Sequence, residues 1–191
     1  MKFFTNIYDY VIGLAYKEKV TRYLYGLSFI ESFIFPIPPD ILLAPIALTK
    51  KYNWIKIAFN TTLFSVLGGL VGYIIGLYLY ESSILNKIVE ENIFIEVKNL
   101  FLEHGFLIMI IAGFTPLPFK AFTITAGYMS IALIPFVVSS FIGRGLRFFI
   151  VAAIFHYFGL IMANRIKKYF EYIGLIITFI LIYFVYLKYY D

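Results

Sequence analysis

The feature that most constrains this chain is one long apolar stretch without a charge. From Ile57 to Tyr80 the sequence contains no Asp, Glu, Lys or Arg. A helix of about 20 apolar residues crosses the hydrocarbon core of a bilayer, so this stretch predicts a transmembrane helix. The composition agrees, since 62% of the 191 residues are hydrophobic and only 14% are charged, against about 25% charged residues in soluble domains. We therefore predict an integral membrane protein.

The charge distribution and the absence of cysteine exclude several kinds of partner and site. The net charge is +5, but the 16 basic residues lie near the ends of apolar segments, as is typical of a membrane helix bundle. This pattern argues against a nucleic-acid partner. The chain has no Cys, and His104 and His156 stand far apart without a carboxylate at a metal-ligand spacing. We expect no disulfide, no metal site and no cofactor.

Prolines and charges divide the sequence into segments. We expect an amphipathic surface helix over residues 1–22, a core over 23–163, and a basic turn with a last transmembrane helix over 164–191. The core is predicted to contain, in order, a re-entrant hairpin over 23–49, a transmembrane helix over 57–80, an acidic amphipathic segment over 81–104, a second re-entrant hairpin over 106–130 and a transmembrane helix over 131–162. The predicted fold class is an all-α polytopic membrane protein.

The two hairpins are predicted from prolines inside apolar segments. Proline fixes φ and lacks an N–H, so a continuous helix cannot pass through such a cluster. The first break contains Pro36, Pro38 and Pro39, between expected half-helices over 23–35 and 40–49. The second contains Pro116 and Pro118.

The two breaks share the pattern Pro-x-Pro-x-charge, which predicts an inverted repeat. The charged residue is Asp40 in the first break and Lys120 in the second. In transporters, broken segments at matching places in two halves point to a substrate site at mid-membrane. The alternative is that Pro-x-Pro only ends helices in surface loops.

Basic residues in short loops predict the topology. Residues 1–22, 50–56 and 165–168 are basic and are expected on the cytoplasmic side, whereas the acidic segment 81–104 is expected outside. A bacterial inner (cytoplasmic) membrane suits a chain of this size.

Five ionisable residues lie inside apolar stretches and are the candidate site residues: Glu31, Asp40, Lys120, Arg144 and Arg147. Each costs about 2.5–3.5 kcal/mol at the centre of a membrane helix, so they should face one another or water. The two arginines are three residues apart and share a helix face. Two adjacent guanidinium groups suit a phosphate, which they bind through paired hydrogen bonds.

Each of these residues also has a structural interpretation. Asp40 could cap its half-helix, and the arginines could extend to an interface. Glu31 could form a purely structural ion pair with an arginine, and Lys120 could mark a hairpin tip that reaches water.

The run Glu31-Ser-Phe-Ile-Phe-Pro-Ile-Pro-Pro-Asp40 resembles the first signature of the DedA family, also called VTT or SNARE-associated membrane proteins. Residues 113–120 resemble the second hairpin of that family, and residues 143–149 resemble its YqaA-like branch. The resemblance extends over most of residues 23–160.

The resemblance implies two opposed re-entrant hairpins and a role in lipid handling. Bacterial members are linked to undecaprenyl phosphate recycling and proton-dependent membrane homeostasis, and eukaryotic members to phospholipid scrambling. Glu31 and Asp40 match the two functional acids of the family. Gly113 and Phe119 stand where typical members carry two arginines, so Lys120, Arg144 or Arg147 would supply the positive charge instead.

The leading hypothesis is a lipid translocase of the flippase or scramblase type, not an enzyme. It would move a phospholipid or undecaprenyl phosphate between leaflets. Lys120, Arg144 and Arg147 would hold the phosphate, while Glu31 and Asp40 would balance the charge or couple transport to protons.

Two other functions and one question of assembly stay open. A proton-coupled carrier of small ions or drugs would use the same fold. A lipid-phosphate enzyme is a different class, but Ser139 and Ser140 lack a nearby His to act as base. The glycine stripe Gly68, Gly72 and Gly76 permits close helix packing within one chain or between copies of a homo-oligomer.

Overall fold

The computed structural model describes residues 13, 15, 19–34, 37–78, 91–115 and 117–159. These residues form helices and connecting turns without a strand, which confirms the predicted all-α class for the part of the chain that the structure describes. Most of the predicted surface helix over 1–22, the first part of the acidic segment and everything after Gly159 lie outside the described residues. Pro36 and Pro116 also lie outside them.

Among the described residues, two helices are long and apolar enough to cross a membrane, namely α4 (Trp54–Tyr78) and the helix Leu133–Gly159. They fall in the two stretches predicted to span. The start of α4 is fixed by Asn53, whose side-chain oxygen accepts hydrogen bonds from the backbone N–H groups of Ile55 (2.9 Å) and Lys56 (3.2 Å). These bonds satisfy donors that have no partner within the helix.

The first broken segment forms two short helices, α2 (Val20–Glu31) and α3 (Asp40–Leu48). α2 begins earlier than the predicted half-helix and ends at Glu31, well before the prolines. Pro39 directly precedes α3 with φ of −61°, a value that suits the start of a helix. Pro38 and Pro39 therefore lie in the break itself.

The second broken segment follows α6 (Glu91–His104). Gly105 adopts φ of +59° between α6 and the next helix, a conformation that favours glycine because it has no Cβ. The segment itself consists of α7 (Leu107–Phe114) and α8 (Phe119–Tyr128). Pro118 directly precedes α8 in extended conformation, so this break also stands beside a proline.

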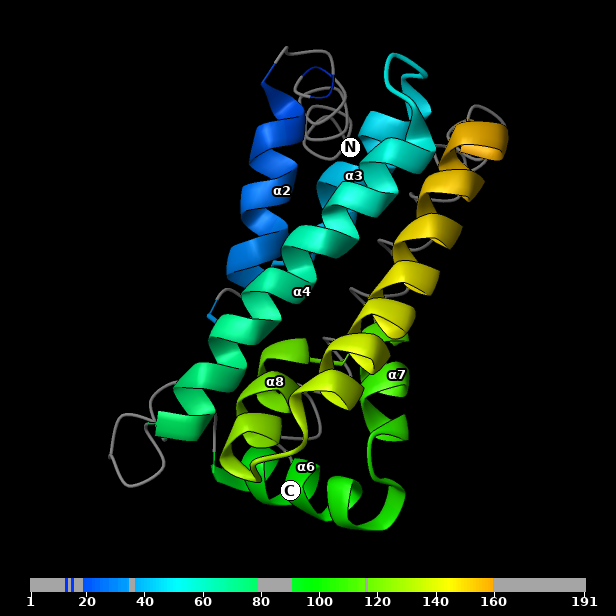
Figure 1. The fold of residues 1–191 in the computed structure, drawn as a ribbon. Coiled ribbons are helices and arrows are strands. Elements are labelled where there is room, and N and C mark those ends of the chain that lie inside the picture. The colour runs from blue at the N-terminus through cyan, green and yellow to red at the C-terminus, as the bar shows by residue number, and fades with distance from the viewer. Residues whose placement is uncertain are drawn as a thin grey trace, which may run out of the picture.

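The two broken segments occupy opposite halves of the bundle. In Figure 1, α2 and α3 lie in the upper half, α7 and α8 lie in the lower half, and α4 and the helix Leu133–Gly159 run past both. The breaks meet near mid-length, where the Thr123 hydroxyl donates to the carbonyl oxygen of Ser32 at 2.9 Å. The depth of these breaks in a membrane and the inverted repeat stay predictions.

The glycine stripe of α4 packs within the chain. A Cβ at Gly68 would collide with the carbonyl oxygen of Phe29 in α2, and one at Gly76 would collide with that of Ile124 in α8. A Cβ at Gly72 would come too close to the side-chain hydroxyl of Thr123 in α8. The small residues therefore let α4 approach both broken segments closely.

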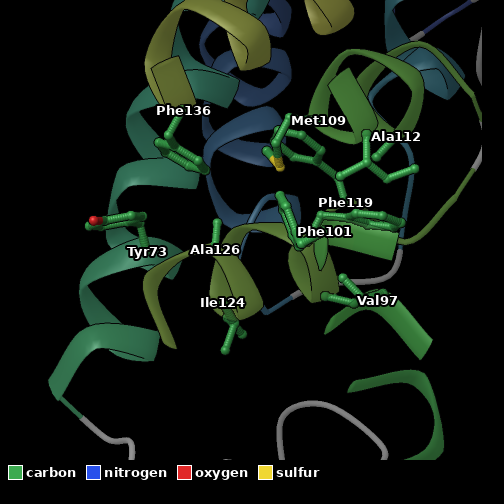
Figure 2. Close-up of a cluster of buried hydrophobic side chains, with 12 residues drawn as sticks. Tyr73, Val97, Phe101, Met109, Ala112, Phe119, Ile124, Ala126 and Phe136 are labelled. Atoms are coloured by element: carbon green, nitrogen blue, oxygen red, sulfur yellow. The ribbon is translucent and has the colours of Figure 1, made fainter. Parts of the chain in front are cut away.

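Two apolar clusters fill the halves of the bundle. Figure 2 shows the lower one, in which Phe119 and Phe136 pack among residues of α4, α6, α7 and α8. The upper one joins Leu24, Leu43 and Ile57 to Phe148 of the last described helix. The layer between these clusters holds the charged residues.

Candidate functional site

Four of the five predicted charges form two ion pairs at the first break. Arg144 Nη2 lies 2.5 Å from Glu31 Oε2, and Arg147 Nη2 lies 2.5 Å from Asp40 Oδ2. Glu31 is the last residue of α2 and Asp40 is the first of α3. Arginines three residues apart on one helix therefore bind the carboxylates on either side of the break, and the expectation that these charges face one another is confirmed.

The Arg144–Glu31 pair is enclosed by the protein. The Arg144 side chain is 2% exposed and that of Glu31 is 11% exposed. The guanidinium lies between the rings of Phe119 and Phe148, at 4.8 and 4.6 Å from their centroids. Such contacts stabilise a desolvated cation. Arg144 does not extend to an interface, so that interpretation of this residue is wrong.

A short relay of serine hydroxyls orients Arg144. Its Nε donates to Ser65 Oγ at 2.8 Å. Arginine has only donors, so Ser65 accepts this bond, and its hydroxyl also forms a hydrogen bond with Ser32 Oγ, 2.9 Å away. Ser32 lies 3.0 Å from the carbonyl oxygen of Ser28, to which it donates.

These serines were not assigned a role from the sequence. The signal for them is weak, namely small polar residues at helical spacing in otherwise apolar helices. Ser28 lies in α2, and Ser32, four residues later, directly follows its last residue. Ser28 Oγ donates to the carbonyl oxygen of Thr61 at 2.9 Å. They connect α2 to α4 beside the ion pair.

The Arg147–Asp40 pair connects the two breaks and is more accessible. Arg147 also donates through Nη1 to the carbonyl oxygen of Thr115 at 2.6 Å, just after α7. The two side chains are 16% and 20% exposed. One arginine thus contacts the start of α3 and the end of α7.

Asp40 uses only one of its two carboxylate oxygens. Oδ2 accepts from both Nε and Nη2 of Arg147, whereas Oδ1 is buried and has no hydrogen-bond partner among the described residues. Asp40 makes no capping hydrogen bond, and Pro39 occupies the capping position. The interpretation of Asp40 as a helix cap is therefore wrong.

Lys120 stands at the contact between the breaks rather than in an ion pair. Its Nζ lies 3.4 Å from the carbonyl oxygen of Ile34, and the side chain is partly exposed. In the part of the chain that the structure describes, no carboxylate pairs with it. A cation beside two neutralised ion pairs gives this layer a net positive charge.

Comparisons with known proteins identify a family match and two relatives of this chain. The family model of the VTT domain matches residues 37–157. An uncharacterized protein of Haemophilus influenzae is 34% identical over 189 residues, covering 97% of this chain and 98% of the relative. An uncharacterized protein of Histophilus somni is also 34% identical, covering 97% and 99%. No solved structure matches the chain.

The family match begins within the first break and includes Asp40, the second break and both arginines, and the relatives match almost end to end. Proteins with this domain are membrane proteins associated with transport or lipid-related functions. The chain belongs to the VTT domain family, the DedA family of membrane proteins.

Proposed function

We propose that this protein moves a lipid with a phosphate headgroup between the leaflets of a bilayer. The observation that carries the proposal is the layer of charge where the two breaks meet. Arginine and carboxylate side chains are costly in an apolar bundle and usually mark a substrate or ion pathway. A polar layer between two broken segments would let the headgroup pass while the acyl chains stay in lipid.

Arg147 and Lys120 are the groups best placed to meet the phosphate. Both side chains are partly exposed, and both touch the two breaks. Arg144 is also a proposed phosphate ligand, but its enclosure means that it would join only after Glu31 and the two phenylalanine rings move. Its resting role in this proposal is to position α2 against the helix Leu133–Gly159.

The ion pair of Arg147 suggests how binding is coupled to protons. A phosphate that approaches Arg147 competes with the Asp40 carboxylate for the same donors. Proton uptake on Asp40 would weaken its hold on Arg147 and free the guanidinium for the incoming anion. The unpartnered Oδ1 supports Asp40 in this role, because a proton can bind there without displacing a hydrogen bond of that oxygen, while it removes the charge that attracts Arg147.

We further propose that both broken segments enter the membrane as opposed re-entrant hairpins related by an inverted repeat. Non-helical backbone at such depth persists only inside protein or beside a wet cavity. The side-chain bonds to the carbonyl oxygens of Ile34 and Thr115 support this, because they satisfy backbone acceptors within the breaks. The membrane would be the bacterial cytoplasmic membrane.

A proton-coupled carrier of small ions or drugs is the second candidate. The same Oδ1 of Asp40 favours it, since an unpartnered buried acceptor could serve a proton or small cation without any lipid. A lipid-phosphate enzyme has less support, because the Ser139 hydroxyl donates to the carbonyl oxygen of Pro135 in its own helix at 2.6 Å.

Reconstitution in liposomes tests the proposal. A fluorescent phospholipid and a labelled polyprenyl phosphate would be followed between leaflets, with and without a pH gradient. We expect fast movement with the unmodified protein, a strong decrease with Asp40→Asn and Arg147→Gln, and no change with Lys56→Gln, which alters an exposed charge at the start of α4. If the folded protein moves neither lipid, the proposal is wrong, and ion flux becomes the next measurement.

A further inference from the structure

The helix α6 has one face that packs on the protein. Val97 and Phe101, four residues apart, are 3% and 4% exposed. The ring of Phe101 lies edge-on to that of Phe122 in α8 at 6.4 Å, and Phe94 contacts Tyr128 at 4.7 Å. α6 is therefore attached along its length to α8, at the lower end of the bundle in Figure 1.

A second face of α6 is apolar and largely exposed. Ile95 and Leu102, seven residues apart, share one side of the helix and are 50% and 69% exposed. The exposed apolar surface continues past Gly105 through Phe106 and Leu107 to Ile111 on the outside of α7. α7 belongs to the second broken segment, so this face of α6 extends the exposed apolar surface of that segment.

The third face of α6 is acidic and exposed. Glu96 and Glu103, again seven residues apart, are exposed to solvent. Because consecutive helix residues are about 100° apart around the axis, each glutamate directly follows an apolar residue yet points away from it. A helix with a protein face, an apolar face and a charged face fits the boundary between water and acyl chains.

The charge of α6 also indicates which membrane surface it meets. The opposite end of the bundle, where α2 and α4 begin, carries exposed cations: Lys19, Arg22, Lys50, Lys51 and Lys56. Anionic headgroups attract such an end and repel the glutamates of α6. The two ends are therefore suited to different leaflets.

We propose that α6 is an interfacial helix that binds the lipid surface, with Ile95 and Leu102 buried among the upper acyl chains and Glu96 and Glu103 in water. The leaflet it binds is the one poorer in anionic lipid. This lipid-contact site is independent of whether the protein transports lipid. Because α6 is attached to α8, contact of α6 with the lipid surface fixes the depth of the second broken segment in the membrane.

The chain offers a direct test because it contains no cysteine. Single cysteines at Leu102 and Ile95, with matched controls at the adjacent Glu103 and Glu96, would carry a nitroxide spin label in phosphatidylcholine liposomes. All four positions are exposed, so the label does not disturb packing. Electron paramagnetic resonance then compares collisions with oxygen, which concentrates among acyl chains, and with a water-soluble nickel chelate.

We expect the labels at Leu102 and Ile95 to collide several-fold more with oxygen than with the chelate, and the two controls to show the reverse. Equal access of the chelate to Leu102 and Glu103 would overturn the proposal, because both sides would then face water. Spin–spin broadening at Leu102 that disappears on dilution with unlabelled protein would also overturn it, since a second copy would then cover this face. Circular dichroism confirms that each labelled variant is folded.

Discussion

Arg147 holds a single oxygen of Asp40 through two donors, at 3.0 and 2.5 Å, and leaves the other oxygen without a hydrogen bond among the described residues. The same guanidinium binds the carbonyl oxygen of Thr115. One side chain therefore keeps both breaks together, while its acidic partner retains an unused acceptor. In the proposed mechanism, a proton on Asp40 releases this interaction.

Replacing Asp40 by Asn tests this relationship. The amide keeps the shape but removes the charge, and we expect the reduced transport that remains to show no dependence on a pH gradient while the protein stays folded. The amide oxygen can still accept hydrogen bonds from Arg147, so the loss of stability should stay within about 1–3 kcal/mol. Flux in liposomes at several pH values is the measurement. Flux with an unchanged response to the gradient would show that Asp40 is not the proton acceptor.

For the enclosed Arg144–Glu31 pair, we predict a large effect on the stability of the protein. Replacing Arg144 by Met leaves Glu31 buried without a partner, which typically costs about 3–5 kcal/mol. The double change of Arg144→Met with Glu31→Gln should regain a large part of that loss, because no unpaired charge stays buried. Thermal unfolding in detergent of the two single variants and the double variant gives the coupling energy. Additive effects would contradict the ion pair.

Ser65 is predicted to support Arg144. In Ser65→Ala, the Nε of Arg144 and the hydroxyl of Ser32 lose a partner, and leaving a buried polar group unsatisfied costs about 1–3 kcal/mol. Ser139→Ala is the matched control, since that buried hydroxyl bonds only to carbonyl oxygens of its own helix. Thermal unfolding should distinguish the two variants, and equal stability would show that the relay has no structural role.

The close approach of α4 to its neighbours gives a prediction about packing. Gly76→Ala should destabilise the protein by about 1–3 kcal/mol, because the new methyl group collides with the backbone of Ile124. Gly26→Ala in α2 is the control, since a Cβ there meets nothing within 4 Å. That change should be neutral or stabilising by up to about 1 kcal/mol. Similar effects at both positions would contradict the intrachain packing of the stripe.

The sequence was sufficient to predict the two long apolar helices, the two breaks and the charged residues beside them, but not which charged residues pair with each other. Proline chemistry places the breaks, and the cost of an intramembrane charge selects Glu31, Asp40 and the two arginines. Which carboxylate binds which arginine depends on the rotation of the helix Leu133–Gly159 against α2 and α3, which local patterns do not determine. The stacking of Phe119 on Arg144 joins residues distant in sequence for the same reason.

Lys120 is predicted to act on the substrate rather than on the fold. Its contact with the carbonyl oxygen of Ile34 is long, at 3.4 Å, and exposed, so Lys120→Gln should change the unfolding temperature little. A cation that meets a phosphate at a partly hydrated site contributes roughly 1–2 kcal/mol of interaction free energy. Its loss should therefore decrease the rate of anionic lipid transport about five- to thirtyfold. Lys51→Gln, at the basic end of the bundle, should leave transport unchanged. Because a zwitterionic lipid still presents a phosphate, its transport should decrease as well, and an effect on ions alone would favour the carrier function.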